Sequence, residues 1–342
     1  MQRKDHLPTT AYIVMTALLG AALCLCVCIG SVNIPLADTL RVLRDVFSGT
    51  PQEEGLNASI ILSVRLPRVL CVALSGAALS LAGAAMQGLL KNPLADGSTL
   101  GVSSGASLGA VISIAFGITF PSLPFAGTVV MAVLFAFLSL LLILSLAWKL
   151  DSSLSTNTII LIGVIFSMFV SSLMNIIITF SADRVQHITF WTMGSLQGSS
   201  YMNAGVLGAV LTICTSVLLS LAEELNAFAV GEENAAHIGV SVRRVKLTVL
   251  ITVSVLIGVC VAIGGTISFV GLVTPHMVRM ITGPNHRRLL PLSLFSGAIF
   301  LMLADLAART LLSPRELPIG VVTSIVGAVV FIFIFYKTRK GR

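Results

Sequence analysis

The stretch "FAGTVVMAVLFAFLSLLLILSLA", residues 125–147, decides the fold class of this chain. It contains no Asp, Glu, Lys or Arg, and its polar side chains are the hydroxyls of Thr128, Ser139 and Ser145. A helix needs about 20 mainly apolar residues to cross the roughly 30 Å hydrocarbon core of a bilayer. The stretch is therefore predicted to be a membrane-spanning helix.

The rest of the chain repeats this pattern. Of its 342 residues, 56% are hydrophobic and 10% are charged, with a mean hydropathy of +1.01, whereas about a quarter of a soluble domain is charged. Two uncharged runs are long enough for two crossings each, because Pro121 with Pro124 interrupts one and Gly264 with Gly265 interrupts the other. The sequence predicts an all-α polytopic membrane protein, one domain over 1–342, with about ten transmembrane helices. They are expected near 11–31, 66–90, 100–119, 125–147, 158–180, 203–222, 246–265, 267–281, 289–308 and 318–336.

The basic residues predict the orientation. Placing both termini in the cytoplasm puts fourteen of the 21 Lys and Arg residues inside and the remaining seven outside, which agrees with the positive-inside rule. The net charge of +7 is then explained by topology and gives no indication of nucleic-acid binding. A multi-pass protein of a bacterial cytoplasmic (inner) membrane, with cytoplasmic termini, is expected.

A polar stripe runs along the fifth expected helix. Gly163, Ser167, Ser171, Asn175 and Thr179 follow one another at a spacing of four, so they share one helix face. Hydrogen bonding between helices, worth roughly 0.6 kcal/mol per contact, is one interpretation. The other, which four successive turns favour, is the wall of a translocation pathway for a polar solute.

The inner loop 223–245 contains a polar island, "GEENAAHIGVSVRRVK", residues 231–246. Gly231 can begin a short helix in which Glu232 and Glu233 occupy the first turn, where the helix dipole favours anions. Gly239 stands where a left-handed cap is expected, and Ser241 can cap the next helix. An isolated helix of this length is unstable in water, so the island is predicted to dock against another protein; a solvated loop is the alternative.

Three stretches resemble one family in its order along the chain. They are "RLPRVLCVALSGAALSLAGAAMQGLLKNPLADGSTLGVSSGASLGA" (65–110), the polar island, and the run from "GTISFVGLVTPHMVRM" to "GVVTSIVGA" (265–328). They are similar to the permease subunits of ABC importers for ferric siderophores, haem and cobalamin. The resemblance implies a type II ABC importer permease fold, a homodimer or close heterodimer, two cytoplasmic ATPase subunits and an extracytoplasmic solute-binding protein.

The resemblance also implies roles for particular residues. The island corresponds to the segment that couples the permease to the ATPase, and its coupling residues are Gly231, Glu232, Glu233, Ala235, His237 and Gly239. Arg65 and Arg309 resemble residues of the external mouth that pair with acidic groups of the binding protein; arginine side chains that snorkel from helix ends are the alternative.

No catalytic or cofactor site is expected in this chain. It contains no GxxxxGK[ST] phosphate loop, so ATP and Mg²⁺ are expected on the partner ATPase and the chain is expected not to be an enzyme. Cys24, Cys26 and Cys28 are two residues apart and point in different directions on a helix, so no metal site is expected. The main rival is an ion-coupled secondary transporter, which needs carboxylates at mid-membrane; Asp305 is the best candidate, and Arg309, four residues on, can neutralise it.

Overall fold

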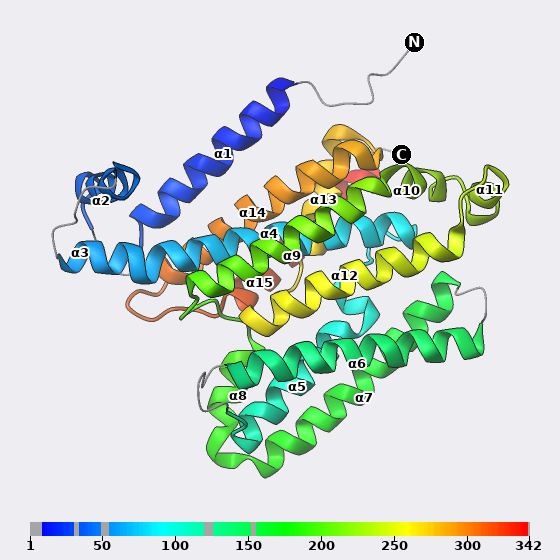
Figure 1. Cartoon of the computed structure of the whole chain (residues 1–342), viewed down its shortest axis with the longest axis horizontal. Coiled ribbons are helices and arrows are strands. Elements are labelled where there is room, and N and C mark those ends of the chain that lie inside the picture. Colours follow the sequence, from blue (N-terminus) through cyan, green and yellow to red (C-terminus); the bar gives the residue numbers. More distant parts are fainter. Residues whose placement is uncertain (1–8, 31–33, 49–54, 120–125, 152–154, 341–342) are drawn as a thin grey trace.

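The computed structural model of the chain describes residues 9–30, 34–48, 55–119, 126–151 and 155–340. Within these ranges the chain is helical and contains no strand (Figure 1). The helices are α1 (Thr9–Cys28), α2 (Leu36–Ser48), α3 (Leu56–Ser59), the π-helix η1 (Ile60–Arg65), α4 (Leu66–Leu89), the 3₁₀ turn η2 (Gly97–Leu100), α5 (Val102–Phe116), α6 (Ala126–Leu150), α7 (Thr156–Phe180), the 3₁₀ turn η3 (Ala182–Arg184), α8 (Val185–Thr192), α9 (Tyr201–Ser220), α10 (Ala222–Phe228), α11 (Glu232–His237), α12 (Val242–Gly264), α13 (Val270–Thr282), α14 (His286–Thr310) and α15 (Ile319–Lys340).

The ranges expected for membrane crossings are occupied by helices, namely α1, α4, α5, α6, α7, α9, α12, α13, α14 and α15. This confirms the predicted all-α polytopic fold. In the described part of the chain, seven helices are long and apolar enough to cross a membrane. Of the remaining three, α5 and the apolar part of α15 are shorter, and α13 has only 13 residues. Gly265, with a φ of +68°, ends α12 as expected, whereas Pro121 and Pro124 lie outside the described residues.

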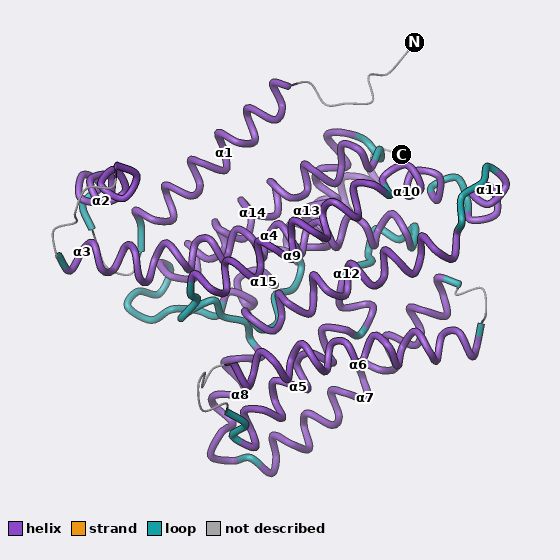
Figure 2. The backbone as a smooth tube through the Cα atoms, in the orientation of Figure 1, coloured by secondary structure: helices purple, strands orange, loops and turns teal. Residues whose placement is uncertain are grey.

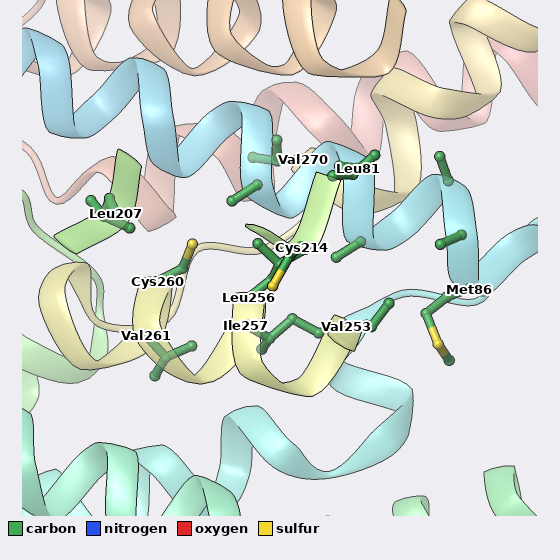
Figure 3. Packing of buried hydrophobic residues seen from close by; sticks show 14 of the residues in the cluster. Leu81, Met86, Leu207, Cys214, Val253, Leu256, Ile257, Cys260, Val261 and Val270 are labelled. Atoms are coloured by element: carbon green, nitrogen blue, oxygen red, sulfur yellow. The ribbon is translucent and has the colours of Figure 1, made fainter. Parts of the chain in front are cut away.

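The helix α4 lies at the centre of the molecule. It is buried along most of its length and packs against α9, α12, α13 and α14. Lipid provides no hydrophobic drive between helices, so close backbone contact through small residues matters more than in water. A Cβ atom at Gly76 would collide with the carbonyl of Gly297 in α14. Figure 3 shows part of this core, with Leu207, Val253 and Val270 of α9, α12 and α13 among the buried residues that pack around α4.

The helices α5, α6 and α7 form a second packed group, which lies beneath α12 in Figure 1. Gly105 and Gly109 of α5 leave room for Ser139 and for the backbone of Met131 in α6. The helix α12 contacts both groups, since it packs against α4 and α9 on one side and α5 and α6 on the other. It is therefore the structural link between them.

Short helices lie at opposite ends of the long ones. Figures 1 and 2 show α2 and α3 at one end of the molecule and α10 and α11 at the other. The polar island is thus separated from the first loop by the full length of the spanning helices.

Candidate functional site

The polar island forms the predicted short helix, α11, and its two glycines adopt backbone conformations that suit glycine. Gly231 precedes the helix with a φ of +131°, and Gly239 follows it with a φ of +94°. The N–H of Val240 donates to the carbonyl of Ala235 at 3.0 Å, and the N–H of Gly239 donates to the carbonyl of Ala236 at 3.0 Å. This pattern closes the C-terminus of a helix through a left-handed residue, so the predicted position of the cap is confirmed.

An ion pair holds α11 to the long helix that follows it. Lys246 of α12 is 1% exposed, and its Nζ lies 2.7 Å from Oε2 of Glu232. Ala235 is fully buried on the same side. Val230 and Ile238, which flank the helix, are 72% and 74% exposed. The helix is therefore fixed on one side and presents an apolar surface on the other.

One detail of the predicted caps is wrong. Ser241 does occupy the N-cap of α12, but its side chain makes no capping hydrogen bond. Its carbonyl accepts from the N–H of Val245 at 3.0 Å instead. The start of α12 is held by Lys246 rather than by the hydroxyl.

The neighbouring helix α10 is tied to α14. Oδ1 of Asn226 accepts a hydrogen bond from the backbone N–H of His286 at 2.8 Å, and its amide nitrogen donates to Oδ1 of Asn285 at 3.1 Å. Glu223 pairs with Arg287. These partners are absent from the sequence prediction, because an Asn in a short polar segment gives no signal of which distant helix it contacts.

A polar cavity lies beside α7, between α5, α12 and the segment 266–271. Its volume is about 320 Å³.

Seven hydroxyl side chains line the cavity beside α7. They come from Ser103, Ser104, Ser107, Ser167, Ser171, Thr266 and Ser268. Asp96 also lines it, so the cavity offers hydrogen-bonding groups to a polar solute.

The structure divides the predicted stripe on α7. Ser167 and Ser171 line the cavity, whereas Asn175 and Thr179 are exposed further along the helix. The hydroxyl of Thr179 donates to the backbone carbonyl of Asn175 at 2.8 Å. The serines of α5 and the segment after α12 complete the lining, and the sequence prediction missed them because they are distant along the chain from the stripe.

Arg65 and Arg309, for which a place at the external mouth is expected, are buried, with exposed fractions of 4% and 3%. Nη1 of Arg65 donates to the carbonyls of Val27 and Cys28, at 2.9 Å each. Arg309 donates to the carbonyl of Cys26 at 3.0 Å. Both guanidinium groups therefore satisfy carbonyls at the C-terminus of α1, where the helix dipole favours cations.

A compact charge cluster surrounds Asp305. Arg68 binds its Oδ1 at 2.9 Å, and Nε of Arg309 lies 2.9 Å from its Oδ2, so the pairing expected between Asp305 and Arg309 is present. Arg68 also pairs with Glu316 at 2.7 Å. Two arginines and two carboxylates thus balance, and both oxygens of Asp305 are engaged, which argues against an ion-coupling site there.

Glu316 lies between α14 and α15, at the edge of this cluster. Burial favours its neutral form, but hydrogen bonds from Arg68 and Gln197 favour the carboxylate more strongly. The net result is a pKa below the usual value. Arg68 and Glu316 are neighbours that sequence spacing could not reveal, since 248 positions separate them.

Apolar helices that surround a cavity with hydroxyl side chains are what a membrane permease for a polar solute requires. Residues 18–337 match the FecCD transport family, and the chain belongs to it. It is 41% identical over 333 residues to the uncharacterized ABC transporter permease protein YvrB of Bacillus subtilis (strain 168), which covers 97% of this chain and 94% of that protein.

Two further comparisons agree. The cobalamin import system permease protein BtuC of Halobacterium salinarum is 36% identical over 283 residues, covering 83% of this chain and 74% of that one. A solved structure of a metal-chelate type ABC transporter in an inward-facing conformation has a TM-score of 0.85 and 32% identity, and covers 96% of this chain and all of that chain. The chain is an ABC importer permease of the FecCD family.

Proposed function

We propose that this chain forms the translocation pathway of an importer for a metal chelate, with a ferric siderophore as the first candidate and haem or cobalamin as the next. The observation that carries the proposal is the cavity beside α7, whose seven hydroxyl side chains can hydrogen-bond to a polar chelate. Relatives named as permeases for cobalamin, hemin and molybdate show that the family accepts different cargoes.

The coupling role is assigned to α11. The buried Ala235 and the ion pair with Lys246 of α12 fix α11 to the bundle. The exposed Val230 and Ile238 beside it offer apolar area to a partner. Exposed apolar surface of this kind marks an interaction site. We assign this surface, with the coupling residues Gly231, Glu232, Glu233, His237 and Gly239, to one of two cytoplasmic ATPase subunits that bind ATP and Mg²⁺.

The complete importer is proposed as two copies of this chain, two ATPase subunits and a solute-binding protein, in a bacterial inner membrane. The whole of 1–342 acts in it as one permease domain with cytoplasmic termini. The binding protein docks at the end of the molecule opposite α11. For Arg65 and Arg309 to contact it, they must release the carbonyls of α1.

The experiment is an uptake assay. Vesicles that contain the permease with its ATPase and binding protein are supplied with ATP and with a radiolabelled ferric siderophore, haem, cobalamin or molybdate. We expect ATP-dependent accumulation of the siderophore, and none when the ATPase is omitted. Uptake that follows an ion gradient without ATP would instead establish a secondary transporter.

The docking assignment has its own test. Arg65→Gln keeps hydrogen-bond donors for the α1 carbonyls but removes the charge. Relative to the parent, the variant should bind the binding protein more weakly. This loss should be larger at low salt than at high salt, because salt screens charge pairs at a rim. Docking that is unchanged at low ionic strength removes Arg65 from the interface.

A further inference from the structure

The helix α2 has a strongly two-sided sequence, LADTLRVLRDVFS. Positions 36, 40, 43 and 47 recur at spacings of four, three and four, which places them on one helix face; all four are Leu or Phe. Asp38, Arg41, Arg44 and Asp45 occupy the other face. The proposed import function uses neither face, so the helix needs its own explanation.

The placement of α2 differs from that of its neighbours. Figures 1 and 2 show α2 nearly end-on, at one end of the molecule, while α1, α4 and α12 cross the view lengthwise. The helix therefore lies across the direction of the spanning helices. It contacts α1 and α3, and Asp38 accepts a hydrogen bond from Asn57 of α3 at 3.1 Å. These contacts fix its height at the end of the spanning segments.

The side chains of α2 divide between the bundle and the outside. Thr39 is fully buried and Val42 packs against the core cluster. Leu40 is 52% exposed, although it lies on the apolar face. Arg41 and Arg44 are exposed on the polar face. The side of α2 with Thr39 and Val42 therefore meets protein, and Leu40 meets whatever surrounds the molecule.

A lipid surface fits this position better than a protein partner. Leu25 in the last turn of α1 and Ile29 just after the helix are also exposed, and apolar side chains at the end of a membrane-spanning helix face hydrocarbon. The hydrocarbon boundary thus reaches the level of α2. An amphipathic helix that lies in the interface buries its apolar face by about 5–10 Å at the headgroup boundary.

We propose that α2 is an in-plane membrane helix at the surface opposite α11, with the Leu40 face in the acyl chains and Arg41 and Arg44 at the phosphate headgroups. Its two acidic and two basic residues cancel, so apolar burial rather than lipid charge holds it. The inference rests on the membrane topology of the chain and is independent of the transported cargo.

The test uses tryptophan fluorescence of the whole permease–ATPase complex in vesicles of phosphatidylcholine with brominated acyl chains. Leu40→Trp and Phe47→Trp report the apolar face, Arg41→Trp reports the polar face, and the parent with its two tryptophans supplies the baseline. We expect bromine to quench the added signal of the first two variants at least about twofold more than that of Arg41→Trp, as the depth of an interfacial helix requires.

Acrylamide in the aqueous phase provides the complementary measurement. It should quench Arg41→Trp more strongly than the two apolar-face variants. If acrylamide quenches all three equally, the apolar face is open to water and the proposal fails. If neither quencher reaches Leu40→Trp and Phe47→Trp, a protein surface covers the face, which also overturns the proposal.

Discussion

Lys246 is the residue on which the position of α11 depends. A lysine with 1% of its side chain exposed is costly to bury unless its charge is paired, and Glu232 supplies the carboxylate. The pair joins the first turn of α11 to the second turn of α12. A force applied to α11 is therefore transmitted to a helix that contacts both packed groups of the bundle.

The first prediction concerns this pair. Lys246→Met keeps the length of the side chain but removes the charge, so α11 loses its tether while the core keeps its volume. ATP-driven uptake should fall by about tenfold, which corresponds to about 1.4 kcal/mol, with the amount of assembled complex unchanged.

Arg244→Met is the matched control, because Arg244 is exposed two positions earlier in the same helix. It should leave uptake within about twofold of the parent, as for most surface substitutions. Equal losses in the two variants would mean that general basic charge, and not the tether, matters here.

Glu316 gives a pH-dependent prediction at the same scale. Its pKa in the folded protein lies below its usual value of 4.5, so its stabilising contribution is present above about pH 4.5 and is lost as the pH falls through the lower folded value. In detergent, the free energy of unfolding should change less between pH 6 and pH 3 in Glu316→Gln than in the parent. The difference should be roughly 1 kcal/mol or less. An unchanged pH profile would show that the Arg68 pair does not stabilise the fold.

At the scale of elements, α7 separates two kinds of polar residue that share one face in sequence. Ser167 and Ser171 line a cavity that α5 and the segment after α12 complete, while Asn175 and Thr179 lie outside its lining. Helical spacing predicts that such residues align, but it contains no information on which neighbouring helix covers each turn. A polar stripe in the sequence therefore gives candidate cavity residues, and the packing of neighbouring helices determines which of them line the cavity.

The cavity leads to the third prediction. Ser171→Leu fills hydroxyl-lined space with an apolar side chain, so uptake per assembled complex should fall about tenfold or more, since a polar solute loses hydrogen-bonding partners. Asn175→Leu should slow uptake less, because Asn175 lies outside the cavity lining. Failure of assembly in Ser171→Leu, with normal uptake per remaining complex, would show that the serine serves packing instead.

At the scale of the molecule, hydropathy predicts the order of the spanning helices because each crossing must be apolar over its own length, whatever it packs against. Hydropathy does not predict which distant groups a buried charge will contact. Their positions at helix ends predict that Arg65 and Arg309 face outward. In the structure both side chains are buried and donate hydrogen bonds to carbonyls at the end of α1. Their partners lie 37 to 283 positions away, and local spacing carries no record of such contacts.

The last prediction concerns the orientation of the whole chain. The positive-inside rule places α11 in the cytoplasm and the segment after α14 outside. Ile238 is 74% exposed beside α11, and Leu311 is 65% exposed just after α14, so a cysteine at either position should react readily. In sealed right-side-out vesicles, a membrane-impermeant maleimide should label Leu311→Cys at once and Ile238→Cys only after the vesicles are opened. The parent, whose exposed thiol is Cys24 within α1, measures the background. Labelling of Ile238→Cys from outside would reverse the orientation and, with it, the assignment of α11 to a cytoplasmic ATPase.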